Sequence, residues 1–290
     1  MSPRRDLLVV AIGGHALSSA DADAMLAGER AAAAAAGREL AALAAGRRLL
    51  LVHGNGPQVG RLLGADSSLD DLDIRVAQTQ GELGYLLAAG LGAAGGEAVV
   101  ALLTRVRVDA GRAGDPEKPI GPILTQRPDT PHVEMPGRRG WRRTVPSPLP
   151  LDVLELAQIR SLLATSHVVA GGGGGVPVAV DGSPVPGVID KDRVAAWLAI
   201  ALDADALVIG TDVDAAYRDF ATPAARRIER MSTQEAESLL AAGVFGPGSM
   251  APKVGSAANF VSATGRLAVI ASMGQLGAAM AGRTGTLVQD

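Results

Sequence analysis

The 290-residue chain has no cysteine, few aromatic residues and only three lysines among its 27 basic residues. Without cysteine it cannot form disulfides, use a catalytic thiolate, or hold zinc or iron–sulfur centres through sulfur. Aromatic residues make up 2% of the chain although 48% is apolar, so the core must consist of Leu, Val, Ile and Ala. Alanine-rich helices pack closely, which suits a layered α/β protein.

The chain also lacks a basic stripe and a long apolar run. Its net charge is −3 and its basic residues are dispersed, which argues against nucleic acid and membrane surfaces as partners. The first apolar run ends at a glycine pair and is too short for a signal peptide, and no stretch free of glycine and charge is long enough to span a bilayer. We therefore expect a cytoplasmic protein.

Short apolar runs alternate with helical segments along the chain. The expected strands are 7–12, 49–52, 99–103, 167–170, 206–209 and 267–270. The expected helices are 21–45, 79–92, 151–163, 192–202, 233–242 and 253–264. This alternation predicts parallel strands joined by crossover helices, and the uninterrupted apolar strands predict a sheet that is covered on both faces.

The proline-rich segment 106–150 breaks this alternation. It contains the run "GRRGWRR" and no clear helix. A disordered linker is one interpretation of such a segment. The alternative is a small protruding subdomain or lid, which we favour because motifs adjoin both of its ends and Trp141 offers an anchor.

Three of the expected strands end in glycine, in "VVAIGGHAL", "LVHGNGPQVG" and "VVAGGGGGVPV". In a parallel sheet these loops can meet at the carboxyl edge, where such folds bind ligands. Glycine has no Cβ, so backbone N–H groups can close around an oxyanion. The spacing in "GNGPQVG" does not fit the dinucleotide fingerprint, and the P-loop signature is absent. Isolated glycines are usually turns, but three loops at equivalent strand ends predict a site for phosphate or a carboxylate.

The rare lysines occupy unusual positions. They are Lys118, Lys191 and Lys253. Lys191 and Lys253 fall in the first turn of expected helices, with Asp190 as an N-cap and Pro252 as a first helical residue, so each faces the positive end of a helix dipole unless an anion is bound. A surface pair of Lys191 with Asp190 or Asp192 is the alternative, and it would stabilise little. Three such lysines together favour phosphoryl transfer, which needs positioned cations.

The stretch "GTDVDAAY" follows another apolar strand. Asp212 and Asp214 could simply end that strand and cap a turn, which is the usual role of an isolated Asp. Beside the lysines, they also suit the polar rim of a nucleotide pocket. Tyr217 would then flank the base.

Taken together, these motifs resemble carbamate kinase, of the amino acid kinase superfamily. The matching stretches, in the family's order, are "VVAIGGHAL", "HGNGPQVG", "TQGELGY", "KPIGP", "WRRTVPSP", "GGGGVPV", "VIDKD", "TDVDAAY" and "GSMAPK". The resemblance implies a three-layer αβα sandwich with a mainly parallel central sheet. It implies a single domain over 1–290, with a small protruding subdomain at about 106–150 and a nucleotide-binding half at about 176–290. It also implies a homodimer that uses ATP and Mg²⁺ and converts carbamate reversibly to carbamoyl phosphate.

The resemblance also implies the site residues. Lys191 and Lys253 would grip the transferring phosphate, Asp192 would orient them, and Lys118 would close over the site. The residues that would cradle the acceptor and phosphoryl oxygens are Gly13, Gly14, Gly54, Asn55, Gly56, Gly172, Gly173 and Gly174. The residues that would line the nucleotide pocket are Thr211, Asp212, Tyr217, Gly248, Ser249 and Met250. Mg²⁺ would be carried by the nucleotide, with no metal ligand from the protein.

The sequence departs from the family pattern near the acceptor. His15 stands where the family has Asn, Ala251 replaces a glycine, and Gly255 replaces a glutamate. We expect the His15 imidazole to donate a hydrogen bond to a phosphoryl oxygen. These departures leave open a kinase for another small carboxylate or phosphonate acid, or a nucleotide-binding regulator without turnover. The lysines and Asp192 disfavour a regulator, which has no need of groups required only in the transition state.

Overall fold

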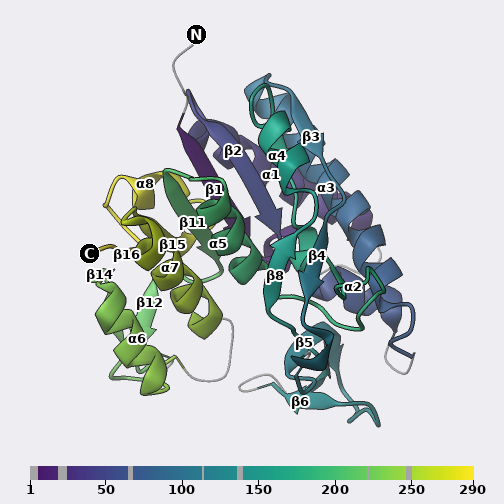
Figure 1. Ribbon diagram of the computed structural model, residues 1–290. Helices are drawn as coiled ribbons and strands as arrows, with labels where there is room; N and C mark the ends of the chain where they lie inside the picture. The colour runs from purple at the N-terminus through teal and green to yellow at the C-terminus, as the bar shows by residue number, and fades with distance from the viewer. Residues whose placement is uncertain are drawn as a thin grey trace.

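An eight-stranded sheet forms the centre of the protein (Figure 1). The computed structural model describes residues 6–18, 25–64, 68–112, 114–135, 140–220, 222–245 and 250–290. The strand order is β14-β16-β15-β11-β1-β2-β9-β3. These strands are β1 (Leu7–Ile12), β2 (Arg48–His53), β3 (Val99–Ala101), β9 (His167–Val169), β11 (Ala206–Thr211), β14 (Arg230–Met231), β15 (Ala268–Ser272) and β16 (Thr286–Val288). Their pairings are parallel except that of β15 with β16, so the expected mainly parallel sheet is confirmed.

Helices cover both faces of this sheet. One face packs against α4 (Leu156–Leu162), α5 (Lys191–Ala201) and α7 (Met250–Thr264). The other face packs against α1 (Met25–Leu43), α3 (Leu72–Gly95) and α8 (Leu276–Met280). In β1, residues 7, 9 and 11 face the first set and residues 8, 10 and 12 face the second, as the two-residue period of a strand requires. The predicted three-layer αβα sandwich is therefore confirmed.

A second, antiparallel sheet lies apart from the central one, at the bottom of Figure 1. Its strands are β5 (Lys118–Leu124), β6 (His132–Glu134) and β7 (Trp141–Val145), in the order β5-β7-β6. Ile120 and Val145 of this sheet pack against Val59 and Leu63 of α2 (Gly56–Leu63). The strands β4 (Arg105–Val108), β8 (Pro150–Val153) and β10 (Val176–Val178) form a third sheet. A hairpin of β12 (Ala216–Arg218) and β13 (Arg226–Ile228) precedes α6 (Thr233–Ala241).

Three boundary predictions are wrong. The helix expected over 151–163 begins only at Leu156, because Pro150–Val153 form β8 and pair antiparallel with β4. Local periodicity could not reveal this pairing, which depends on a distant strand. The helix α3 begins at Leu72, before the expected start, and α7 begins before Pro252, which is therefore not its first residue. Residues 21–24 of the first expected helix lie outside the described residues.

Within the described part of the chain, no helix combines the length and the hydropathy that a bilayer crossing requires.

The strand order changes direction at β1. The chain passes from β1 to β2 on one side, and later reaches β11 on the other side of β1. The carboxyl ends of β2, β1 and β11 are therefore neighbours, and β9 follows β2. The fold therefore places the glycine loops at one common edge of the sheet. Ligands of open α/β sheets bind at such a switch point.

Two glycines, Gly37 of α1 and Gly90 of α3, allow these helices to cross closely. A Cβ built on Gly90 would lie 2.6 Å from the carbonyl oxygen of Ala33, whereas a Cβ on Gly81, also in α3, would meet no atom of the described residues within 4 Å. We expect Gly90→Ala to lower the free energy of unfolding by about 1–3 kcal/mol through overpacking. The control Gly81→Ala should raise it by about 0.5–1 kcal/mol through helix propensity. Urea unfolding of both variants tests this, and equal effects would contradict the close crossing.

Candidate active site

Two of the three lysines meet at one carboxylate. Lys191 Nζ lies 2.7 Å from Asp192 Oδ1, and Lys253 Nζ lies 2.9 Å from Asp192 Oδ2. Lys191 is the first residue of α5 and Lys253 lies in the first turn of α7, so the N-termini of two helices converge here. All three side chains are at most 10% exposed. Because both carboxylate oxygens are engaged, Asp192 fixes the position of each ammonium group.

The third lysine joins the cluster through Asp190. Lys118 Nζ of β5 lies 2.9 Å from Asp190 Oδ2. The other oxygen, Oδ1, accepts a hydrogen bond from the Asp192 N–H at 2.9 Å, so Asp190 is the N-cap of α5, as predicted. Its pairing with Lys118 is a contact that sequence reasoning missed. The two residues are 72 positions apart, and no local signal joins them.

The charges in this cluster perturb one another. Burial lowers the pKa of Lys191 to about 8, although the charge of Asp192 opposes the shift. Burial acts on Lys253 in the same direction and is the largest single influence, but the charge and hydrogen bond of Asp192, together with the charge of Asp190, outweigh it and raise the pKa of Lys253 above its ordinary value. Burial opposes ionisation of Asp190, yet the ammonium groups of Lys118 and Lys191 hold the pKa of Asp190 well below its usual range. Three cations and two anions leave an excess positive charge, which suits an anionic ligand.

The glycine loops lie against the lysines. A Cβ built on Gly54 would be 2.7 Å from Gly14 N and 3.1 Å from Lys191 Cδ. A Cβ on Gly173 would overlap the side-chain amide of Asn55, and one on Gly174 would overlap the backbone at Ile189. Such close packing admits only glycine. The structure therefore brings the loops after β1, β2 and β9 together beside Lys191.

The other expected cradle residues differ in how tightly they are packed. Gly172 is packed against the His53 ring, so a side chain there would overlap the imidazole. A Cβ on Gly13 would meet no atom of the described residues within 4 Å, and one on Gly56 would come no closer than 3.9 Å. His15 is exposed in a short 3₁₀ turn, η1 (Gly14–Leu17), directly after Gly14.

The expected nucleotide-binding residues follow β11 and begin α7. Thr211 ends β11, and its hydroxyl lies 3.3 Å from Asp212 Oδ1. The hydroxyl of Tyr217 donates to Asp214 Oδ1 at 2.8 Å, and this bond raises the pKa of Tyr217. Met250 is the first described residue of α7, one turn before Lys253. Gly248 and Ser249 lie outside the described residues.

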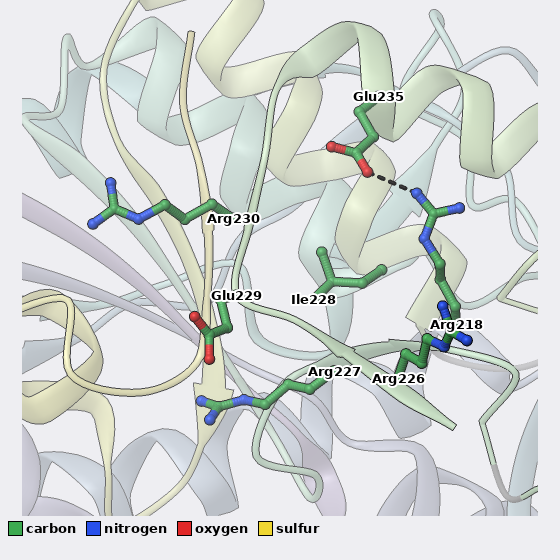
Figure 2. Close-up of a pocket in the computed structure, with 7 residues that line it drawn as sticks. All are labelled: Arg218, Arg226, Arg227, Ile228, Glu229, Arg230 and Glu235. Carbon is green, nitrogen blue, oxygen red and sulfur yellow. Dashed lines mark hydrogen bonds and ion pairs between the residues drawn. The ribbon is translucent and has the colours of Figure 1, made fainter. Parts of the chain in front are cut away.

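A hollow of about 450 Å³ lies beside the β12–β13 hairpin (Figure 2). Its lining residues are Arg218, Arg226, Arg227, Ile228, Glu229, Arg230 and Glu235. Arg218 pairs with Glu235 of α6 at 2.7 Å, and Arg226 is the cross-strand neighbour of Arg218. The lining includes neither the lysines nor the glycine loops. This hollow is therefore a separate surface feature from the lysine cluster.

A buried histidine supports two of the glycine loops. His53 ends β2 and is 1% exposed. Its Nδ1 lies 3.1 Å from the carbonyl oxygen of Gly54, which can only accept, so Nδ1 carries the proton. Burial lowers the pKa of His53 to about 4, although the bond to Gly54 opposes this shift. His53 is therefore neutral at physiological pH. Sequence reasoning gave it no role.

The family model of the amino acid kinase family matches residues 6–272 of the chain. The chain therefore belongs to the amino acid kinase family and is a phosphotransferase.

Within this family, its relatives include carbamate kinases. It is 41% identical to the carbamate kinase of Halobacterium salinarum, over 83% of this chain and 84% of that protein. It is 37% identical to the carbamate kinase of Lentilactobacillus hilgardii, over 97% and 96%. The carbamate kinase of Giardia lamblia bound to AMP-PNP superposes with a TM-score of 0.82 at 32% identity, covering 100% of this chain and 99% of that one. The same enzyme bound to citric acid gives 0.86. The predicted resemblance to carbamate kinase is confirmed.

The buried His53 should make stability depend on pH. Its pKa is about 4 in the folded protein and 6.5 in the unfolded chain, so below pH 6.5 the unfolded state binds the proton first. Stability should therefore be lost as the pH falls from 6.5 toward 4, by on the order of 3 kcal/mol from this group. Urea unfolding across this range should show a shallower loss in His53→Asn, which keeps a donor for Gly54. Equal slopes in wild type and variant would refute this role.

Proposed function

We propose that this protein is an ATP-dependent kinase that phosphorylates carbamate to carbamoyl phosphate, and that the reaction is reversible. The observation that carries the proposal is the convergence of Lys191 and Lys253 on Asp192 beside the glycine loops. The names of its relatives supply the substrate, because the similar proteins are carbamate kinases. The bound AMP-PNP in the Giardia lamblia enzyme supports an adenine nucleotide as the second substrate.

The transfer is direct and in line. The bond between the γ-phosphorus and the bridging oxygen of ATP breaks while a carbamate oxygen forms the new P–O bond, so no covalent enzyme intermediate arises. Lys191 and Lys253 stabilise the charge on the phosphoryl oxygens, and Asp192 holds both before the substrates arrive. One lysine about 4 Å from this charge contributes roughly 4 kcal/mol, on the order of a thousandfold in rate.

The acceptor lies in the glycine-lined half of the site. Backbone groups of the residues 13–14, 54–56 and 172–174 surround its oxygens, and His15 donates to a phosphoryl oxygen. Lys118 closes over the acceptor by exchanging Asp190 for a substrate oxygen. This exchange is possible because the pair is only partly buried, with Lys118 21% and Asp190 19% exposed.

The nucleotide binds at the other half of the edge. The residues that line its pocket are Thr211, Asp212, Tyr217, Gly248, Ser249 and Met250. Mg²⁺, when bound to the nucleotide, neutralises charge on the phosphate oxygens. Both Asp192 oxygens already accept from lysines, so this carboxylate fits the role of orienting cations better than that of ligating the metal. The nucleotide phosphates would then hold Mg²⁺ without a ligand from the protein.

The wider organisation belongs to the same proposal. The segment 106–150 acts as the protruding subdomain that carries Lys118, and residues 176–290 form the nucleotide-binding half. The homodimer implied by the resemblance and the cytoplasmic location expected from the sequence complete it.

Replacing Lys191 by methionine should lower the rate of ATP formation from ADP and carbamoyl phosphate by about a thousandfold, because one stabilising cation is lost. Arg38→Met removes a cation from the exposed surface of α1 and should leave the rate unchanged. A coupled assay of ATP formation measures both, and thermal unfolding confirms that the variants are folded.

The same assay separates the alternatives. A wild type that turns over another small carboxylate or a phosphonate, but not carbamoyl phosphate, would replace the proposed substrate. A wild type that binds ATP without turnover of any small acid would point to a regulator.

The lowered pKa of Lys191 predicts a falling limb in the pH profile. As the pH rises through about 8, Lys191 loses its proton in the free enzyme, so kcat/KM should fall. Arg keeps its charge throughout this range. The profile of Lys191→Arg should therefore lose the limb near pH 8, whatever its absolute rate. A limb that persists in this variant would assign it to another group.

A further inference from the structure

Two adjacent residues of α3, Thr79 and Gln80, lie behind the glycine loops; we call them the α3 pair. They belong to the motif "TQGELGY", and neither has a role in the chemistry described above. Thr79 is 0% and Gln80 4% exposed. Buried polar side chains are costly unless they are hydrogen-bonded, so their partners show what each one holds.

Thr79 orients the side chain of Asn55. The Asn55 Nδ2 donates to Thr79 Oγ1 at 2.8 Å, and Thr79 Oγ1 donates to the carbonyl oxygen of Val76 at 2.8 Å. A hydroxyl has one hydrogen, so Thr79 can only accept from Asn55. The amide of Asn55 must therefore turn its NH₂ group toward α3. Since the same amide packs against Gly173, Thr79 fixes a contact between the loops after β2 and β9.

Gln80 holds the loop after β9 from its other end. Its Nε2 donates to the carbonyl oxygen of Thr104 at 3.0 Å, and its Oε1 accepts from the Thr104 N–H at 2.9 Å. The Thr104 hydroxyl in turn accepts from the N–H of Gly171 at 2.9 Å. Gly171 has a φ of 67°, the left-handed conformation in which the glycine loop begins. Gln80 thus acts on that turn through Thr104.

We propose that the α3 pair are positioning residues, which hold the glycine loops after β2 and β9 in the geometry that binds the phosphoryl acceptor. The inference rests on the proposed function and deepens it, because it assigns acceptor specificity to side chains behind the loops. Neither residue of the α3 pair contacts the nucleotide-side residues through any bond in the described part of the chain. Their loss should therefore act on the acceptor and spare the nucleotide.

The variant Thr79→Val keeps the shape of the side chain and removes its hydroxyl. We expect its kcat/KM for carbamoyl phosphate to fall about 10- to 100-fold, as for a displacement of about 1 Å in a reacting site, while the KM for ADP changes less than about twofold. Thr79→Ser retains the hydroxyl and should restore most of the loss. Gln80→Met should show the same selectivity.

The control is Thr264→Val at the end of α7. Its hydroxyl also donates to a carbonyl oxygen of its own helix, that of Phe260, at 2.7 Å, so the substitution removes a similar bond away from the glycine loops. It should leave both substrates unaffected. A loss for ADP equal to that for carbamoyl phosphate in Thr79→Val would show general destabilisation and overturn the inference.

Hydrogen exchange tests the positioning without activity. The amides of residues 53–56 and 171–175 should exchange faster in Thr79→Val and in Gln80→Met than in wild type, and at the wild-type rate in Thr264→Val. Unchanged exchange in both α3 variants would overturn the inference even if the wild type is an active kinase. Faster exchange in the α3 variants, combined with a wild type that turns over no small acid, would support the positioning role and refute the proposed function alone.

Discussion

The site depends on one carboxylate that holds two ammonium groups inside the protein. Asp192 contacts Lys191 with one oxygen and Lys253 with the other. The two ammonium groups repel each other, and each also lies at the positive end of a helix dipole. Their close approach is therefore unfavourable without Asp192. Buried charges that lose a partner cost several kcal/mol. Under the proposed function, a phosphate bound beside Lys191 and Lys253 would offset their mutual repulsion, so the fold would give up stability for binding.

Parallel topology explains why these groups meet. In a crossover unit, the strand and the following helix run in opposite directions, so helix N-termini and strand carboxyl ends share one edge. The glycine ends of β1, β2 and β9 and the first turns of α5 and α7 are found there. Glycine has no side chain, so the loops can pack closely against one another. The lysines supply positive charge beside them. The rare lysines and the glycine-rich strand ends therefore lie at the same edge of the sheet.

The sequence predicted what is local or compositionally rare. The six central strands, the N-cap Asp190 and the closeness of Lys191 to the glycine loops follow from apolar runs and from residues used against the bias of the chain. It could not predict contacts that only the folded chain creates. β8 pairs with β4, Lys118 contacts Asp190, and the Gln80 side chain bonds to the backbone of Thr104. No local pattern in the sequence joins the partners of any of these contacts. His53 was missed because a single histidine beside glycine does not reveal its burial.

The two carboxylate oxygens of Asp190 bind different parts of the protein. Oδ1 caps α5, and Oδ2 binds Lys118 on the antiparallel sheet. Because the two contacts use different oxygens, the ion pair with Lys118 can break without loss of the hydrogen bond that caps α5. Under the proposed function, Lys118 would exchange Asp190 for a substrate oxygen while the hydrogen bond from Asp190 Oδ1 to the Asp192 N–H stays in place. The first turn of α5, which carries Lys191 and Asp192, would then keep its geometry during that exchange.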